Sequence, residues 1–336
     1  MIITRTPLRI SFLGGGTDYP DHFRQYGGQT LGVAINKYSY IILKELAPLF
    51  DYTSCISYRK TELVKEIADI QHPSVRECFR FYSIPGNVEV HYIGDLPAKS
   101  GLGSSSSFTV GLLHALGVYR GEFPSLLSLA SDAVHVEREM IKERVGFQDQ
   151  YTCALGGLVH LQYNSDNTVT VNRVLPSPER LSELESHLML FYTGIQRFAH
   201  TVLDEQMEKT RSGAITNELV ELGGLVDQGI EVLIGDKPII EFGGILHDSW
   251  MIKRKLSSKI SNSFIDEAYE RARKAGASGG KLLGAGGGGF LLFLAQPDHH
   301  SAVEHALTGM PRIPIQFDST GSTLIFNESG SGSTIL

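Results

Sequence analysis

Residues Pro97–Ser107 form the stretch PAKSGLGSSSS, which lies between a predicted strand that ends near Gly94 and a predicted apolar helix that begins near Phe108. Its glycines remove side chains and its serines supply hydroxyl groups. The start of the helix adds exposed backbone N–H groups at the positive end of the helix dipole. The stretch is therefore typical of an anion-binding loop at a helix N-terminus.

The alternative interpretation is an ordinary helix N-terminus that contains several serines. Four consecutive serines exceed what capping requires, because a single serine suffices for that purpose. The stretch is not a Walker A loop, since the pattern GxxxxGK[ST] is absent from the chain. If the chain binds a nucleotide, its fold therefore differs from that of the P-loop proteins. A serine hydroxyl of this stretch could still bind Mg²⁺, as the P-loop serine does.

The third of three glycine-rich stretches along the chain, Lys281–Leu294 (KLLGAGGGGFLLFL), is called the third glycine loop and contains the bare pattern GxGxxG. The dinucleotide-binding fingerprint follows a strand and opens a helix, whereas these glycines precede the predicted strand Phe290–Ala295. A plain tight turn would not need so many glycines. We expect a flexible loop that packs closely against a ligand or against another glycine loop.

The first of the three stretches along the chain, Leu13–Tyr19 (LGGGTDY), follows the apolar run Ile10–Leu13. Successive glycines allow positive φ angles and let a ligand approach the backbone closely. Asp18 and Tyr19 then place polar groups beside the opening. A strand-to-helix turn capped by Thr17 or Asp18 explains the same residues equally well.

Predicted strands alternate with predicted helices along the chain, which indicates an α+β or α/β protein. The strands, rich in β-branched and aromatic residues, are 39–43, 88–93, 188–192, 290–295 and 323–326. The helical patterns cover roughly 104–118, 125–144, 198–211, 216–234, 247–258 and 262–275. The turn-rich stretch 164–186 suggests a boundary, so we expect domains at 1–175 and 176–328 and a flexible tail at 329–336.

The predicted helix 125–144 carries a carboxylate, Glu137, on its apolar stripe. A buried carboxylate is costly unless it is paired or binds a metal. Pairing with Arg138 or Lys142, or incomplete burial of the stripe, is the ordinary explanation. Asp149 follows in the polar loop GFQDQ, where it is either a turn residue or a carboxylate that orients a hydroxyl acceptor.

The composition is ordinary for a soluble globular protein, with 42% hydrophobic and 20% charged residues among 336. The formal net charge of −7 disfavours general nucleic-acid binding. No apolar run approaches the roughly 20 residues of a membrane-spanning helix, and the N-terminus lacks the pattern of a signal peptide, so we expect a cytoplasmic protein. Cys55, Cys78 and Cys153 show no metal-binding spacing, which favours reduced, buried thiols.

The three glycine-rich stretches resemble, in order and spacing, the three motifs of the GHMP kinases. PAKSGLGSSSS resembles the central ATP-binding motif and KLLGAGGGGFLLFL resembles the third, and the resemblance extends from Pro7 to about Leu294. It implies an α+β fold of two domains with the active site between them. The N-terminal domain would be ribosomal-protein-S5-like and carry the phosphate loop, and the C-terminal domain would be ferredoxin-like. The implied chemistry is phosphoryl transfer from ATP with Mg²⁺.

The resemblance also implies roles for individual residues. Asp149 matches the catalytic aspartate, and Arg9 matches the arginine beside it. Glu137 matches the helical Mg²⁺ ligand, and Ser105 matches the loop serine that completes the metal shell. Asp18 matches the residue that hydrogen-bonds sugar hydroxyls. The implied ATP-binding residues are Pro97, Lys99, Ser100, Gly101, Leu102, Gly103, Ser104, Ser105 and Ser106. The implied substrate-binding residues are Gly15, Gly16, Asp18, Tyr19, Arg197, Gly286 and Gly287.

The first motif indicates the kind of acceptor. Galactokinases carry a Glu-His pair before Thr-Asp-Tyr, whereas this chain has Gly15 and Gly16 there. The segments RTPLRISFLGGGTDYPDHF, GVAINKY and GFQDQY are instead similar to D-glycero-D-manno-heptose 7-phosphate kinases, the sugar-1-kinases that make heptose 1,7-bisphosphate for GDP-heptose. Fucokinase domains share a shortened, glycine-rich first motif and, with galactokinase-like enzymes, form the alternative.

A phosphate on the substrate would need cationic partners. Arg24, Lys37, Arg197 and His200 are candidates, although each is more simply explained as a surface or ion-pair residue. A regulator that binds sugar and ATP without catalysis would show a broken phosphate loop or a missing catalytic aspartate, and both are intact here. The sugar-type first motif also disfavours a decarboxylase of the mevalonate diphosphate branch. The expected partners are a sugar or sugar phosphate and ATP, with the chain as a monomer or homodimer.

Overall fold

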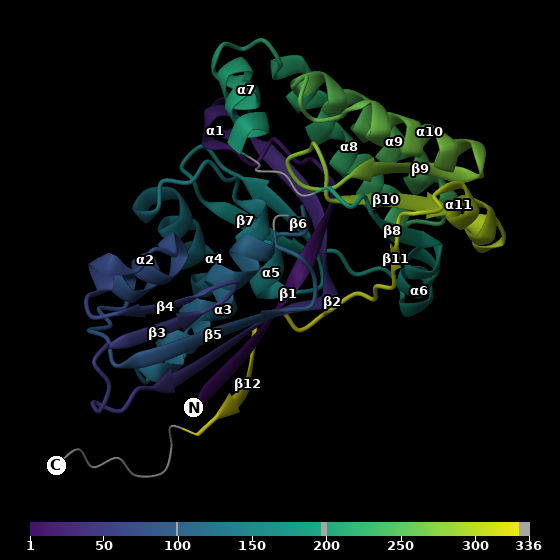
Figure 1. Cartoon of the computed structure of the whole chain (residues 1–336). Coiled ribbons are helices and arrows are strands. Elements are labelled where there is room, and N and C mark those ends of the chain that lie inside the picture. Colours follow the sequence, from purple (N-terminus) through teal and green to yellow (C-terminus); the bar gives the residue numbers. More distant parts are fainter. Residues whose placement is uncertain (99, 196–199, 329–336) are drawn as a thin grey trace.

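The structure, a computed structural model, describes residues 1–98, 100–195 and 200–328 (Figure 1). Within these residues the larger of two sheets has eight strands, in the order β12-β1-β2-β5-β3-β4, with β6 pairing β2 and β7 pairing β6. Its strands are β1 (Ile2–Leu13), β2 (Gly28–Glu45), β3 (Ser54–Ser57), β4 (Thr61–Val64), β5 (Val88–Gly94), β6 (Leu158–Tyr163), β7 (Val169–Arg173) and β12 (Thr323–Asn327).

Helix α3 (Ser104–Tyr119) packs on this sheet and carries the serine-rich loop at its N-terminus. Thr4 donates from Oγ1 to the carbonyl of Gly111 at 2.8 Å, and a Cβ at Gly111 would lie 2.9 Å from Oγ1 of Thr6. The glycine therefore lets α3 lie close against β1. The other helices of this half are η1 (Ile67–Asp69), α1 (Pro20–Tyr26), α2 (Pro73–Phe81), α4 (Leu126–His135) and α5 (Gln148–Leu155).

The smaller sheet has four antiparallel strands within the described residues, in the order β11-β8-β10-β9. This strand order, with helices between β8 and β9 and between β10 and β11, is that of the predicted ferredoxin-like domain. The strands are β8 (Leu188–Tyr192), β9 (Ala277–Leu282), β10 (Phe290–Ala295) and β11 (Arg312–Ile313). The helices are α6 (Pro178–His187), α7 (His200–Arg211), α8 (Thr216–Ile234), α9 (Ile240–Leu256), α10 (Ser263–Lys274), η3 (Pro297–His299) and α11 (His300–Ala306).

The two halves share an apolar core. Phe12 of β1 packs edge-to-face on Phe242 of α9, with ring centroids 5.4 Å apart. Gly229 of α8 faces Leu13, and a Cβ at this glycine would overlap the leucine side chain. Residues from both halves therefore bury one another in one continuous core.

Several elements differ from the sequence prediction, which did not include helix α2 or strand β6, and two further differences affect the architecture. Strand β12 lies within the range 176–328 expected for the second domain, but it pairs with β1 in the first sheet (Figure 1). The strand is half exposed, so its sequence carries no buried face that would show which sheet it joins. The helix predicted at 125–144 ends as α4 at His135 and continues only as a π-helical turn, η2 (Val136–Met140). The boundary near residue 175 stays a prediction.

The cysteines are buried with free thiols, as predicted. Burial raises the pKa of Cys78 and Cys153 well above the ordinary value, so neither behaves as a reactive thiolate. Among the described residues, no helix combines the length and the apolar character that crossing a membrane requires.

We predict that Gly279→Ala destabilises the protein by about 2 kcal/mol or more, because a Cβ on β9 would overlap the carbonyl of Gly243 in α9. Gly224→Ala is the matched control. It adds the same methyl group to an exposed position of α8 with open space around it, and we expect stabilisation of up to about 0.8 kcal/mol from helix propensity. Urea unfolding of both variants measures the difference. Equal free energies of unfolding would contradict the close packing of α9 on β9.

Candidate active site

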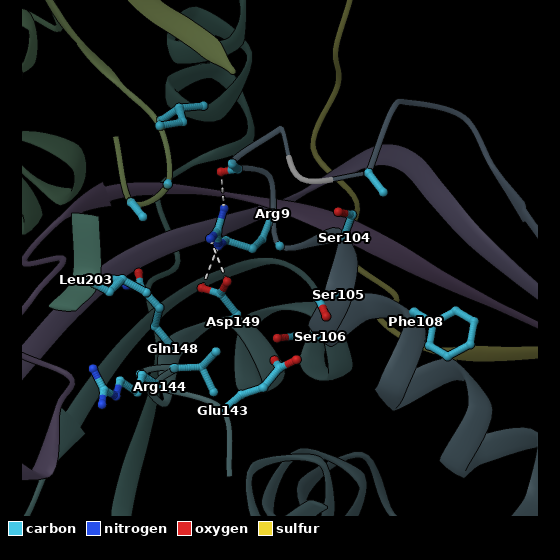
Figure 2. Close-up of a pocket in the computed structure, with 18 of the residues that line it drawn as sticks. Arg9, Ser104, Ser105, Ser106, Phe108, Glu143, Arg144, Gln148, Asp149 and Leu203 are labelled. Carbon is cyan, nitrogen blue, oxygen red and sulfur yellow. Dashed lines mark hydrogen bonds and ion pairs between the residues drawn. The ribbon is translucent and has the colours of Figure 1, made fainter. Parts of the chain in front are cut away.

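A cleft of about 690 Å³ lies between the two halves. Its walls come from β1, the glycine turn after β1, the serine loop, α5, α7, α9 and the third glycine loop (Figure 2). The structure therefore brings all three glycine-rich stretches together. The predicted residues that line the cleft are Arg9, Gly15, Gly16, Asp18, Tyr19, Gly101, Gly103, Ser104, Ser105, Ser106, Asp149 and Gly286.

Arg9 and Asp149 form a bidentate ion pair in this cleft (Figure 2). Nε of Arg9 donates to Oδ1 at 2.8 Å, and Nη2 donates to Oδ2 at 2.7 Å. Burial lowers the pKa of Arg9, but the charge and hydrogen bonds of Asp149 more than offset this, so the pKa is raised. Asp149 lies in the first turn of α5, not in the predicted loop, and its side chain is 28% exposed toward the cleft.

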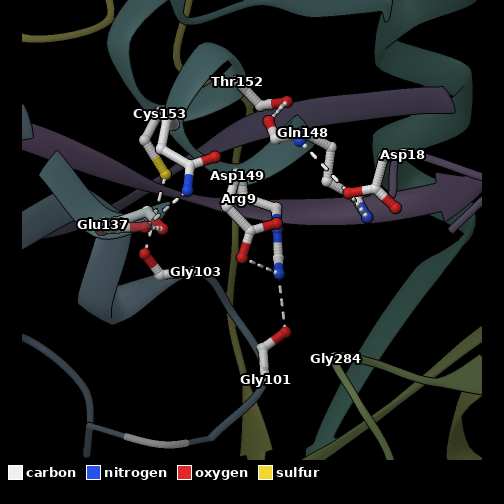
Figure 3. A network of polar contacts seen from close by, with 12 residues as sticks. Arg9, Asp18, Gly101, Gly103, Glu137, Gln148, Asp149, Thr152, Cys153 and Gly284 are labelled. Atoms are coloured by element: carbon white, nitrogen blue, oxygen red, sulfur yellow. Dashed lines mark hydrogen bonds and ion pairs between the residues drawn. The ribbon is translucent and has the colours of Figure 1, made fainter. Parts of the chain in front are cut away.

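The same arginine holds the serine loop in place. Nη1 of Arg9 donates to the carbonyl of Gly101 at 2.7 Å (Figure 3), and its backbone N–H donates to the carbonyl of Leu102 at 3.0 Å. Gly103, with φ of +73°, packs on the arginine side chain, where a Cβ would lie 2.9 Å from Cγ. Any residue other than glycine at this position would push the loop away from the ion pair.

The serine loop and the third glycine loop touch through their backbones. A Cβ at Gly101 would lie 2.5 Å from the carbonyl oxygen of Leu283, and a Cβ at Gly284 would lie 2.5 Å from Cα of Gly101. Both glycines also have positive φ, at +87° and +76°. The prediction that the third loop packs against another glycine loop is therefore confirmed.

Asp18 is 1% exposed and lies on the glycine-turn side of the cleft. It accepts hydrogen bonds from the backbone of Gly16 (3.1 Å) and from the backbone (3.3 Å) and side chain (3.2 Å) of Gln148 (Figure 3). Burial and the neighbouring charge of Asp149 raise the pKa of Asp18. Helix α1 begins without a side-chain cap, so the alternative that Asp18 only caps a helix is wrong.

Glu137 is fully buried beside the serine loop. Its Oε2 accepts hydrogen bonds from Oγ of Ser106 (2.9 Å) and Nε2 of Gln150 (2.5 Å). The resemblance implied Ser105 as a metal ligand together with Glu137, and that role stays a prediction; the serine that is hydrogen-bonded to Glu137 is its neighbour Ser106. Each helical residue turns the side-chain direction by about 100°, so Ser106 faces η2 while Ser105 faces the cleft. Arg138 does not pair with Glu137 and donates instead to the carbonyl of Val145.

The oxygen donors around Ser106 fit a Mg²⁺ ion. Oε1 of Glu137 is closed from solvent and forms no hydrogen bond with the described residues. Burial raises the pKa of Glu137 to about 7, and a nearby divalent cation would reverse that effect. Glu143, which the sequence did not single out, lines the cleft and points its carboxylate toward Ser106 (Figure 2). One or two carboxylates with hydroxyl and phosphate oxygens form a typical Mg²⁺ environment.

Several predicted ATP- or substrate-binding residues do not line the cleft but shape its loops. Ser100 donates from Oγ to the carbonyl of Pro97 at 2.7 Å, and Leu102 is fully buried. The amide of Gly287 donates to the carbonyl of Ile260 at 2.8 Å. These residues set the backbone path of the two glycine loops.

Four cationic residues were predicted to bind a substrate phosphate. Those whose side chains the structure describes do not line the cleft. Arg24 is hydrogen-bonded to Asn167 at the surface, and neither Arg24 nor Lys37 lines the cleft. Arg197 lies outside the described residues, as does the predicted ATP-binding residue Lys99. The side chain of His200 also lies outside the described part of the chain.

Two buried lysines line the cleft although the sequence did not indicate them. Lys253 of α9 donates from Nζ to the carbonyl of Gly284 at 2.5 Å, and Lys281 of β9 donates to the carbonyl of Phe12 at 2.6 Å. Lys281 is the first residue of the third glycine-rich stretch, and this position was the sequence signal that could have identified it as a cleft residue. Lys253 lies in the basic run WMIKRKL, which is typical of an exposed helix end, so only the tertiary structure identifies it.

Aromatic side chains line the end of the cleft that lies away from Asp149. His72 and Phe108 pack with ring centroids 4.8 Å apart, and Tyr92 meets Phe108 at 5.3 Å. Tyr58 completes the group at 4.8 Å from His72. These residues come from α2, α3, β5 and the loops beside them, and no local sequence pattern predicted that they would meet.

The geometry agrees with comparisons to known proteins. The family model of the GHMP kinases N terminal domain matches residues 62–157, and that of the GHMP kinases C terminal domain matches residues 232–312. The chain is 30% identical over 320 residues to the D-glycero-alpha-D-manno-heptose 7-phosphate kinase of Campylobacter jejuni, covering 88% of this chain and 90% of that protein. It is 27% identical to the bifunctional fucokinase/GDP-fucose pyrophosphorylase of Arabidopsis thaliana, covering 86% of this chain and 29% of that protein.

A solved structure supports the same relationship. The D-glycero-D-manno-heptose 1-phosphate kinase from Bacteroides thetaiotaomicron is 26% identical and superposes with a TM-score of 0.71, covering 98% of this chain and 100% of that one. The chain therefore shares sequence and fold with these proteins over most of its length. The chain belongs to the GHMP kinases, phosphotransferases that act on hydroxyl groups.

Proposed function

We propose that this GHMP kinase is a sugar-1-kinase that transfers the terminal phosphoryl group of Mg·ATP to the anomeric hydroxyl of D-glycero-D-manno-heptose 7-phosphate. The observation that carries the proposal is the bidentate pair of Arg9 and Asp149, whose partly exposed carboxylate shares the cleft with the serine loop and Asp18. The similarity to the Campylobacter heptose kinase supports this acceptor. The product, heptose 1,7-bisphosphate, would enter a cytoplasmic route to GDP-heptose.

Asp149 acts as the base in this proposal. Its oxygens accept hydrogen bonds from Arg9 on one side, so the acceptor hydroxyl approaches from the cleft. The hydroxyl proton moves to the carboxylate while the hydroxyl oxygen bonds to phosphorus and the bond from phosphorus to ADP breaks. Arg9 holds the carboxylate in orientation and offsets the negative charge of the approaching phosphates.

The serine loop binds the phosphates of the nucleotide. Backbone N–H groups of Gly101–Ser105 and the positive end of the α3 dipole stabilise the phosphate oxygens. Glu137 would hold Mg²⁺ together with Ser105 or Ser106, with Glu143 on the cleft side. When bound, the ion neutralises charge on the β- and γ-phosphates. The aromatic end of the cleft suits the flat face of the nucleoside base.

The acceptor end of the cleft favours a sugar larger than galactose. A Cβ at Gly15 would lie 3.4 Å from Oγ of Ser11 and 3.6 Å from Nε2 of Gln148, which both line the cleft, so glycine at this position leaves that space to the acceptor. Arg144 is exposed, lines the cleft and is ion-paired with Asp204, and we propose it as a partner for the 7-phosphate. Fucose is the second candidate acceptor, because the plant fucokinase matches most of this chain.

We predict that Asp149→Asn lowers kcat by about 10³-fold, because the amide keeps the shape of the side chain but cannot accept the hydroxyl proton. Affinity for ADP should change less than threefold. Asp166→Asn, the same change in an exposed turn, is the control and should keep wild-type rates. Coupled-assay kinetics and nucleotide titration measure both effects. Wild-type turnover in Asp149→Asn would rule out the role of the base.

We predict that Glu137→Gln changes how stability depends on pH when Mg²⁺ is chelated. Burial raises the pKa of Glu137 to about 7 in the folded protein, above its ordinary value. The wild type should therefore lose stability as pH rises from about 4.5 to 7, by up to about 3 kcal/mol. The glutamine variant has no carboxyl group to titrate and should lack this loss, whereas Glu139→Gln, an exposed control in the same turn, should retain it.

Unfolding free energies of the three proteins between pH 4 and 8, with EDTA and with Mg²⁺, test this prediction. Adding Mg²⁺ should restore the wild type at high pH and should have little effect on Glu137→Gln. Parallel pH curves for the wild type and Glu137→Gln in EDTA would contradict the raised pKa, and an equal response of the two proteins to Mg²⁺ would contradict a metal at this carboxylate.

An acceptor panel tests the substrate. We expect kcat/KM for D-glycero-D-manno-heptose 7-phosphate to exceed the values for L-fucose, D-galactose and D-mannose by at least about 10²-fold, a ratio that one lost charged contact can produce. ATP consumption is the readout, and phosphorus NMR of the product identifies the phosphorylated hydroxyl. A preference for any unphosphorylated sugar would overturn the heptose assignment while leaving the kinase assignment intact.

A further inference from the structure

Lys253 is a buried cation that the mechanism above does not use. It lies in α9 and is 8% exposed, yet it lines the cleft. Its ammonium group has three N–H donors, of which one is used by the carbonyl of Gly284 at 2.5 Å. No carboxylate within the described residues forms an ion pair with it. Because a buried ammonium group with one neutral partner is costly, its retention in the cleft indicates an anionic ligand.

The position of Lys253 points to the reacting end of the nucleotide. The carbonyl that it holds belongs to Gly284, whose backbone touches Gly101 of the serine loop. Arg9 holds the carbonyl of Gly101 from the other side. A cation from each half of the chain therefore donates a hydrogen bond to one of the two loops where these loops touch. Arg9 also forms an ion pair with Asp149.

We propose that Lys253 binds the phosphoryl group that is being transferred and so acts as a second cationic catalytic residue beside Arg9. The proposal rests on the kinase chemistry and on the roles proposed for Arg9 and Asp149, but it does not depend on which sugar is the acceptor. The two N–H donors that Gly284 leaves free reach the γ-phosphoryl oxygens from the third glycine loop, opposite the serine loop. Charge on these oxygens during transfer is what a fixed ammonium group stabilises.

The charged groups around Lys253 imply a characteristic pH dependence. Burial and the charge of Arg9 on β1 lower the pKa of Lys253 to about 8, while Asp18 and Asp149 oppose this effect. Lys281 on β9 also faces it as a like charge. The rate should therefore fall as the pH rises through about 8 and the ammonium group loses its proton. Bound γ-phosphoryl would raise this pKa, so the basic limb of kcat should lie above that of kcat/KM.

Nucleotide binding separates this role from a purely structural one. In Lys253→Met we expect ADP affinity to stay within twofold of the wild type, whereas affinity for a non-hydrolysable ATP analogue falls at least tenfold. The kcat should fall about 10²-fold with every acceptor that the enzyme uses. Lys255→Met, the same change at an exposed position of α9, is the control and should leave both affinities unchanged. Lys253→Arg should recover much of the rate and move the basic limb upward, because arginine stays protonated.

Equal loss of affinity for ADP and for the ATP analogue, or no loss of either, would overturn the proposal. So would an unchanged basic limb in Lys253→Arg. If the methionine variant does not fold, Lys253→Gln replaces it, since glutamine can still donate to the carbonyl of Gly284 without carrying charge. Failure of the heptose assignment is distinguishable, because it would change the preferred acceptor and leave the ADP-to-analogue affinity ratio of these variants as expected.

Discussion

Gly101 and Gly284 come from loops in opposite halves of the chain, and their backbones lie so close that neither position has room for a Cβ. This contact sets where the serine loop lies relative to β1. Arg9 then reaches the carbonyl of Gly101 and the carboxylate of Asp149 with one guanidinium group. In the proposed mechanism, phosphate binding and proton transfer are therefore coupled through a single side chain.

Packing elsewhere in the molecule fixes the positions of the residues that form this contact. Gly111 lets α3 lie close to β1, so the helix N-terminus and Arg9 have a fixed relation. The packing of Phe12 on Phe242 buries the two halves against each other, so the width of the cleft follows from the core beneath it. Burial raises the pKa of Glu137 to about 7, and in the proposed mechanism a bound cation would favour its charged form.

Much of this site was predictable because its chemistry depends on local patterns. The glycines and serines at the start of α3 favoured an anion site, and the carboxylate of Glu137 on an apolar stripe was visible from helical spacing. Features of the site that depend on tertiary contacts were not predictable from the sequence. Helical phase, altered by the π turn, decides that Ser106 and not Ser105 meets Glu137. Lys253 looked like a surface residue in a basic run. Helix α2 was missed although Pro73 at its first turn is a recognisable start signal.

The proposed phosphoryl transfer depends most on which atom of the acceptor lies beside the Asp149 carboxylate. A crystal structure with Mg·ADP and D-glycero-D-manno-heptose 7-phosphate tests this directly. We expect the anomeric hydroxyl within hydrogen-bond distance of the Asp149 carboxylate, about 2.6–3.2 Å, with the β-phosphate of ADP on the serine loop and the 7-phosphate away from Arg9. A different hydroxyl or the sugar phosphate beside Asp149, or nucleotide phosphates away from Gly101–Ser106, would contradict it.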